Sequence, residues 1–216
     1  MKEYNRKRTL TAAVLICISV LLFWIMERVT AYYWIDPVYN FKKNWISDLG
    51  IPVVTQISGY TVNSPLHALM NFTFIVYGLL VVIAYVMLKS ILPKERIARL
   101  LAISHGIGFI LVGIFPGYEW SLGFMHQFGA ILVIFGGNIA IILLGINIYR
   151  ESRQIFAVTG IILGIAGLIA TIIMFANSTS PIAGIYERGA IYPTLIWNFI
   201  LGAYILVKMK IIQDRK

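Results

Sequence analysis

Charged residues are scarce in this sequence, and cysteine is nearly absent. Asp, Glu, Lys and Arg make up only 12% of the 216 residues, whereas 59% are hydrophobic. A soluble domain typically carries about 25% charged residues, and a chain this apolar could not cover its core with polar surface. The single cysteine, Cys17, lies inside an apolar run, which excludes a disulfide scaffold. The composition is typical of a multi-pass membrane protein.

Long apolar runs, by contrast, are abundant. A membrane-spanning helix needs roughly 20 mostly apolar residues, and backbone groups in hydrocarbon find partners only within a helix or a closed barrel. No barrel-like alternation is visible, so each run is predicted to be a helix. The sequence predicts one all-α integral membrane domain over residues 1–216. Its six transmembrane helices are predicted at residues 9–30, 64–88, 99–115, 121–149, 155–176 and 190–208.

The basic residues are distributed unevenly between the predicted loops. Of the 18 Lys and Arg residues, 14 lie at the two termini and in the second and fourth loops. Lys and Arg accumulate in cytoplasmic loops, so both termini are predicted to be cytoplasmic and the protein to lie in the cell membrane. The first outer loop, residues 31–63, is unusually long, and such loops are often functional. No basic stripe is interleaved with aromatics, so nucleic acid is not an expected partner.

Ionisable and amide side chains are costly inside a bilayer and usually mark functional sites there. Here they gather near the predicted outer helix ends, where side chains from distant parts of the chain can reach one layer. The histidines are the predicted catalytic residues, because imidazole titrates near neutral pH. His67 or His126 would act as general base or headgroup donor, and Asp48 would orient an imidazole. The predicted binding residues are Asn44, Ser47, Asn71, Glu187 and Arg188, of which Arg188 would hold an anionic headgroup.

Each of these residues also has a purely structural interpretation. The histidines could be ordinary hydrogen-bonded residues at helix ends, and Ser47-Asp48 could cap a short helix. Glu187 and Arg188 could pair with each other or with lipid headgroups. No HxxxH, HExxH or CxxC spacing is present, so neither a metal nor a cofactor is expected. Three deeper polar residues are interpreted as an interhelical network, or else as a polar path inward: His105, Asn138 and Asn198.

Small residues form a stripe on the predicted fifth span. Gly160, Gly164 and Gly167 lie on one helical face, and small residues let helix backbones approach closely in a membrane. The preferred interpretation is packing inside the bundle. The alternatives are a homodimer through this face or contact with another membrane protein.

Several short motifs together resemble a known family. They are Ile46-Ser47-Asp48-Leu49-Gly50, the segment from Ser64 to Asn71, Gly106-Ile107-Gly108 followed by residues 112–116, and Met125-His126-Gln127. Over nearly its whole length the chain resembles the prokaryotic multi-pass family catalogued as domain of unknown function 998. Its Ser-Asp-Leu-Gly element is also similar, more weakly, to autophagy-modulator and GPI-lipid-remodelling membrane proteins. The resemblance implies a six-helix membrane fold and no activity. It makes Ser47, Asp48, His67, Pro116 and His126 the most distinctive positions.

Three functions are compatible with the sequence, and they predict different structures. The leading hypothesis is an outward-facing site that binds, and in its stronger form modifies, a membrane lipid or other amphiphile. It predicts a polar pocket between the second, fourth and sixth spans, closed on the inner side. A small-solute transporter predicts a path through the midplane past His105, Asn138 or Asn198. A structural or accessory subunit of a membrane complex predicts neither feature. Whether the protein is an enzyme is left open.

Overall fold

The computed structural model describes residues 3–57, 59–90, 96–118, 123–150 and 154–214, which are mostly helical. Within these residues, six helical segments are long and apolar enough to cross a membrane. The predicted all-α fold is therefore confirmed, and the chain is a multi-pass membrane protein. The elements in chain order are α1 (Glu3–Tyr33), η1 (Ser47–Gly50), β1 (Thr55–Ile57), β2 (Tyr60–Val62), α2 (His67–Met87), η2 (Leu88–Ser90), α3 (Arg96–Ile114), α4 (Gly123–Ile131), η3 (Leu132–Gly136), α5 (Gly137–Arg150), α6 (Gln154–Ala176) and α7 (Ala183–Asp214).

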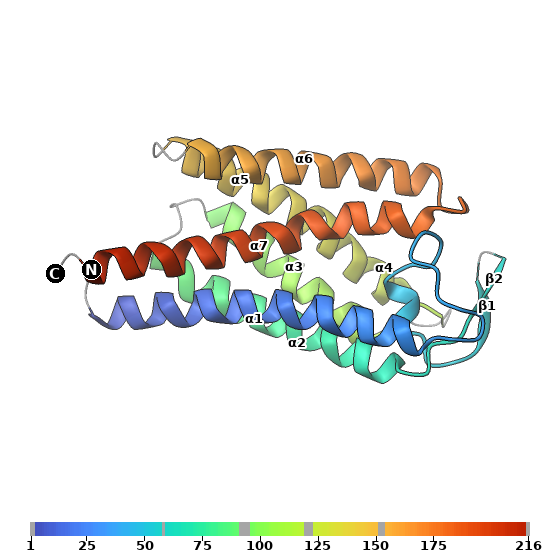
Figure 1. Ribbon diagram of the computed structural model, residues 1–216. Coiled ribbons are helices and arrows are strands. Elements are labelled where there is room, and N and C mark those ends of the chain that lie inside the picture. The colour runs from blue at the N-terminus through green and yellow to red at the C-terminus, as the bar shows by residue number, and fades with distance from the viewer. Residues whose placement is uncertain (1–2, 58, 91–95, 119–122, 151–153, 215–216) are drawn as a thin grey trace.

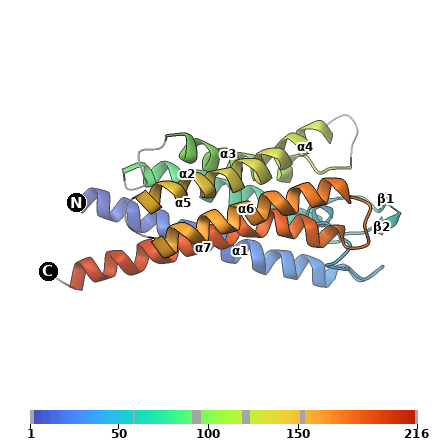
Figure 2. The same ribbon diagram turned by 90° about the horizontal axis from the view of Figure 1, so that it is seen from above.

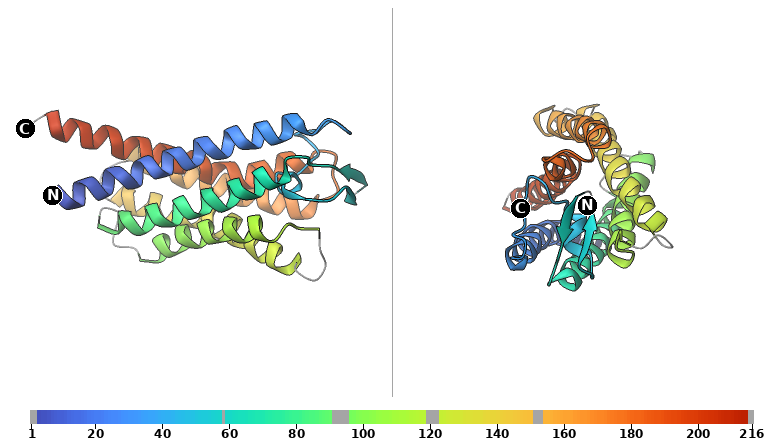
Figure 3. Two further views of the ribbon diagram at one scale, coloured as in Figure 1. Left: turned by 90° about the horizontal axis from the view of Figure 1, so that it is seen from below. Right: turned by 90° about the vertical axis from the view of Figure 1, so that its right-hand side faces the viewer.

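The spans form a closed ring in which each packs against its neighbours in sequence (Figure 3). α1 contacts α2, α2 contacts α3, and α3 contacts both α4 and α5. α5 contacts α6, α6 contacts α7, and α7 returns to α1. Both termini lie at one end of the bundle, whereas β1 and β2 lie at the other (Figures 1 and 2). This second end, called the distal end below, corresponds to the predicted outer side.

Several helix ends differ from the sequence prediction, and two differences in the helices bear on the site. The fourth span is α4, η3 and α5 in series, because η3 is a π-helical turn within it. The first two residues predicted for this span, 121–122, lie outside the described part of the chain. α7 begins at Ala183 and not at residue 190, so Glu187 and Arg188 lie in a helix instead of a loop. Two adjacent charged residues are typical of a loop, which is why the sequence predicted one here. In the structure, buried partners compensate both charges.

Close backbone contacts between helices depend on glycine. A Cβ atom on Gly106 of α3 would lie 2.8 Å from the carbonyl oxygen of Gly78 on α2. One on Gly108 would lie 2.5 Å from the carbonyl oxygen of Gly129 on α4. These distances are too short for any side chain. Small residues thus set the spacing of neighbouring spans, as is usual in membranes.

The glycine stripe on α6 is used in the same way. Gly160 packs against the Trp197 ring of α7, while Gly164 and Gly167 pack against Asn138 of α5. All three glycines are buried. Within the chain, this glycine stripe therefore packs against α5 and α7 inside the bundle. The opposite face of α6 carries exposed isoleucines, including Ile162, Ile169 and Ile172, and faces outward.

A chain of hydrogen bonds crosses the bundle below the distal end. The Tyr85 hydroxyl donates to Asn198 Oδ1 at 2.7 Å, and Asn198 Nδ2 donates to the Tyr77 hydroxyl at 3.1 Å. The Tyr77 hydroxyl oxygen lies 3.1 Å from His105 Nε2, and His105 Nδ1 lies 2.8 Å from the carbonyl oxygen of Val133. Because a carbonyl oxygen only accepts, Nδ1 carries a proton and Nε2 accepts from Tyr77. His105 and Asn198 therefore form the predicted interhelical network, whereas the third member has its own partners: Asn138 donates to the carbonyls of Ile134 and Ala190.

Candidate functional site

The first loop is attached to α7 by the carboxylate of Glu187. This side chain accepts a hydrogen bond from the backbone N–H of Ile46. It also accepts from the Ser47 hydroxyl at 3.2 Å and from the Ser47 N–H at 3.4 Å. Glu187 is only 5% exposed, so these donors replace the water that a buried carboxylate loses. The Glu187 bonds fix the start of η1 against the bundle.

Arg188, the next residue, holds an earlier part of the same loop. Its guanidinium lies 3.1 Å from the carboxylate of Glu27 on α1 and donates to the Tyr39 hydroxyl at 2.6 Å. Glu27 also accepts from the Tyr192 hydroxyl at 2.7 Å. Arginine has five N–H donors, and the remaining ones bond the carbonyl oxygens of Phe41, Asn44 and Gly184. Arg188 is thus fully engaged inside the protein, and Asn44 supports the loop through its backbone.

Asp48 anchors the loop from within η1. Its Oδ2 atom accepts from the Trp45 N–H at 2.8 Å and from the Tyr60 hydroxyl at 2.6 Å, which ties β2 to η1. Burial raises the pKa of Asp48 to about 6, although the hydrogen bonds from Tyr60 and Trp45 and the positive charge of Arg188 act in the opposite direction. Burial and the neighbouring Asp48 charge also raise the pKa of Tyr60, so the phenol keeps its proton. Asp48 was expected to orient an imidazole; in the described residues its partners are Trp45 and Tyr60.

The remaining side of η1 rests on the start of α2. Asn71 Nδ2 donates to the carbonyl oxygen of Gly50 at 2.7 Å, and the Ser64 hydroxyl donates to that of Leu49 at 2.7 Å. A Cβ atom on Gly50 would collide with the Asn71 side-chain oxygen. The Ser-Asp-Leu-Gly element and the Ser64–Asn71 segment are therefore two halves of one contact. Asn71 supports the loop and is not among the residues that line the pocket described next.

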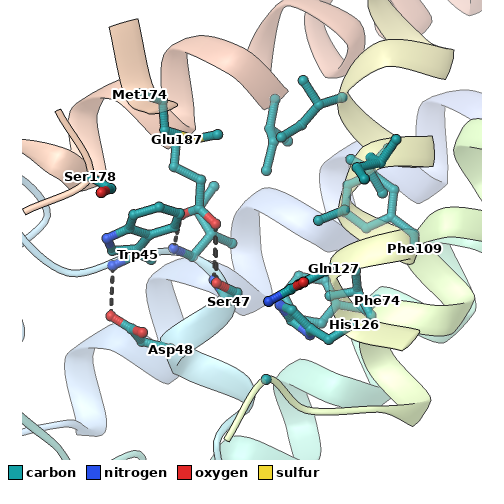
Figure 4. A pocket seen from close by; sticks show the side chains of 18 of the residues that line it. Trp45, Ser47, Asp48, Phe74, Phe109, His126, Gln127, Met174, Ser178 and Glu187 are labelled. Atoms are coloured by element: carbon teal, nitrogen blue, oxygen red, sulfur yellow. Dashed lines mark hydrogen bonds between the residues drawn. The ribbon is translucent and has the colours of Figure 1, made fainter. Parts of the chain in front are cut away.

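A pocket of about 450 Å³ lies beneath this loop. Figure 4 shows Glu187, Ser47, His126 and Gln127 around it, with Phe74 and Phe109 deeper in the bundle. Most of its walls are apolar, and the polar side chains come mainly from the loop, α4 and α7. The lining residues are Trp45, Ile46, Ser47, Asp48, Ile51, Ile57, Tyr60, Phe74, Phe109, Val112, Gly117, His126, Gln127, Ala130, Ile131, Val133, Ile134, Phe135, Met174, Phe175, Ser178, Glu187 and Ile191.

Exposure of the lining residues shows where the pocket opens. Phe109 and Ile134 are buried, whereas Ile131 and Phe135 on the fourth span are 48% and 37% exposed. Phe175 at the end of α6 is 61% exposed. The pocket is therefore closed toward the bundle interior. It opens sideways, between the fourth span and α6, where apolar side chains face outward, and also toward the distal end, where the lining residues Gln127 and Ser178 are exposed.

The two predicted outer histidines are separated by the fold. His126 lines the pocket, and its Nδ1 donates to the carbonyl oxygen of Phe115 at 2.9 Å. In a neutral imidazole this arrangement leaves Nε2 as a hydrogen-bond acceptor. His67 begins α2 and is not a lining residue. Within the described residues no group of three or more His, Cys, Asp or Glu side chains could hold a metal ion.

The structure thus sorts the predicted site residues into two sets and leaves one residue outside both. Ser47, Asp48, His126 and Glu187 line the pocket, and Asn44, Asn71 and Arg188 hold the loop above it. His67 belongs to neither set. Sequence reasoning missed the aromatic and amide lining residues, because neither a span nor the first loop carries a local signal that distinguishes a pocket-facing side chain from a packed one. These residues are Trp45, Tyr60, Phe74, Phe109, Gln127 and Phe175.

Comparison with other proteins gives a family and no activity. No curated protein and no solved structure matches this chain. A family model does match residues 17–204, a stretch that holds every residue lining the pocket and every residue holding the loop. This chain belongs to the family described as "Protein of unknown function (DUF998)".

Proposed function

We propose that this protein binds a membrane lipid or similar amphiphile in the pocket beneath the first loop. The observation that carries the proposal is the sideways opening between the fourth span and α6. A ligand can enter there from the bilayer. The volume of about 450 Å³ lies within the range of roughly 300–1,000 Å³ that small-molecule sites occupy.

The distribution of polarity along the pocket supports an amphiphile. Phe74, Phe109 and Ile134 offer apolar surface to a chain, whereas Ser47 and His126 offer hydrogen-bonding groups to a head. Such a gradient fits a molecule with one polar and one apolar end. The bias of basic residues toward the opposite end of the bundle supports a position of the pocket in the outer leaflet of the cell membrane.

The deep polar residues favour binding over transport. The residues of the His105 network hydrogen-bond to one another across the bundle. The void beside them measures about 10 Å³, which is at most the space for a single water molecule. A transport path through the midplane would require this network to come apart. An accessory subunit would make no use of the pocket.

A labelling experiment tests the proposal. The purified protein in lipid nanodiscs is incubated with a palmityl alcohol that carries a diazirine in its chain, irradiated, and digested for mass spectrometry. We expect labelled peptides from the pocket mouth, around Phe135 and Phe175. An Ala130→Trp variant fills the pocket and should lose this labelling. Ala166→Trp is the matched control, because Ala166 is exposed on α6 outside the pocket. Equal labelling of both variants would contradict the proposal.

A further inference from the structure

Two acidic side chains lie at the polar end of the pocket, and no lining Lys or Arg accompanies them among the described residues. Its ionisable lining residues are Asp48, Tyr60, His126 and Glu187, and within the described chain the lining contains neither Lys nor Arg. Two carboxylates therefore line the pocket, whereas Arg188, the cation whose charge acts on Asp48, is not a lining residue. Even the neutral imidazole of His126 presents an acceptor, since its Nδ1 proton is donated to Phe115.

The nearby cations are held outside the pocket. Arg188 is buried behind the wall and is bound to Glu27, to Tyr39 and to backbone carbonyls. Lys43 lies over the Tyr60 ring, with its Nζ atom 4.9 Å from the ring centroid, and is not a lining residue. Arg188 was expected to hold an anionic headgroup, but its donors are used in holding the loop.

The carboxylate of Asp48, which lines the pocket, retains acceptor capacity. Both hydrogen bonds that the described residues donate to Asp48 are accepted by Oδ2. An ionised carboxylate offers about four lone-pair sites, so Oδ1 can accept from a ligand. Glu187 divides its bonds between both oxygens, and these bonds come from Ile46 and Ser47. A hydroxyl or ammonium head would supply the missing donors, whereas a phosphate or carboxylate head would add a like charge at a desolvated site.

Resting on the proposed function, we infer that the ligand is a long-chain amphiphile whose head donates hydrogen bonds and carries no negative charge. Long-chain alcohols and long-chain amines share this chemistry. Phosphate-headed and carboxylate-headed lipids lack it.

The test uses diazirine probes with one chain and different heads: palmityl alcohol, palmityl amine and palmityl phosphate. At equal probe density in nanodiscs, the alcohol or the amine should label the peptides around Phe135 and Phe175 at least about tenfold more than the phosphate. Preference for the alcohol indicates a neutral head, and preference for the amine indicates a cationic one. Equal labelling by all three would overturn the head-group inference and leave the proposed function standing. If none labels the pocket, the proposed function itself fails.

A positive charge added at the polar end of the pocket gives a second, independent readout. Gln127 lines the pocket and is exposed, so a Gln127→Lys variant should fold normally and supply the missing cation. We expect it to raise labelling by the phosphate probe severalfold. Gln56→Lys is the matched control, because Gln56 is exposed on β1 at the same end of the bundle and does not line the pocket. An equal rise in both variants, or a rise in neither, would contradict the inference.

Discussion

Glu187 and Arg188 are consecutive on α7, yet their side chains hold different parts of one loop. Glu187 bonds the start of η1 at Ile46 and Ser47, whereas Arg188 bonds residues 39–44 and the end of α1. Successive side chains of a helix point about 100° apart, so the two residues separate two halves of the loop. This arrangement holds the long first loop in a fixed position over the pocket.

Removing the Arg188 guanidinium should destabilise the protein strongly. An Arg188→Met variant leaves Glu27 buried without its cation, and breaking a buried ion pair from one side costs about 3–5 kcal/mol. We expect a clear fall in the thermal unfolding midpoint in detergent. Glu27→Gln combined with Arg188→Met should be less destabilised than the two single variants together predict. Arg28→Met is the control, because Arg28 is exposed beside the same cluster and its loss should change the midpoint little.

The stability of the protein should depend on the protonation of Asp48. Its pKa is raised to about 6 in the fold, above the ordinary 3.8, so the folded state binds a proton that the unfolded state has released between these values. The free energy of unfolding that this proton binding adds is therefore fully present below about pH 4, and it is lost as the pH rises through about 6. We expect Asp48→Asn to flatten this part of the pH profile of the unfolding midpoint. Asp36→Asn, on an exposed residue of the same loop, should leave the profile unchanged. An identical slope in wild type and Asp48→Asn would refute the assignment.

Side chains added at the glycine contacts should disrupt helix packing. Gly164→Leu would force α6 away from the Asn138 carbonyl oxygen, which lies only 2.7 Å from the position of a Cβ atom. We expect low yield of folded protein and a broadened peak on size exclusion. The same change at the neighbouring Ala166, which is exposed on α6, should be tolerated. Normal folding of Gly164→Leu would show that α5 and α6 do not pack through this face.

The spans could be predicted because apolar length is a local property of the sequence. The start of α7 could not be predicted, because two adjacent charged residues, Glu187 and Arg188, indicate a loop when their buried partners are unknown. Arg188 and Glu27 are 161 positions apart, so no local pattern reveals the pair. The π-helical turn η3 likewise has no marker in an apolar run.

The residues that gather at the pocket could be predicted only in part, for a related reason. Polar residues at one depth were visible, and Ser47, Asp48, His126 and Glu187 do line one pocket. What each polar group bonds depends on the three-dimensional path of the loop. His67 was grouped with the others by depth alone, and depth does not specify which way a helix face points.

Separation of the deep network from the pocket gives a final prediction. Tyr77→Phe removes the hydroxyl that joins His105 to Asn198 and leaves polar atoms of both unpaired in a buried position. Such a loss costs about 1–3 kcal/mol, so the unfolding midpoint should fall. Labelling of Phe135 and Phe175 by the palmityl alcohol probe should persist, because Tyr77 does not line the pocket. Tyr32→Phe, at a residue 79% exposed, should alter neither measurement. If Tyr77→Phe abolished labelling while the protein remained folded, the network and the pocket would be one continuous site, and the transporter hypothesis would regain its physical basis.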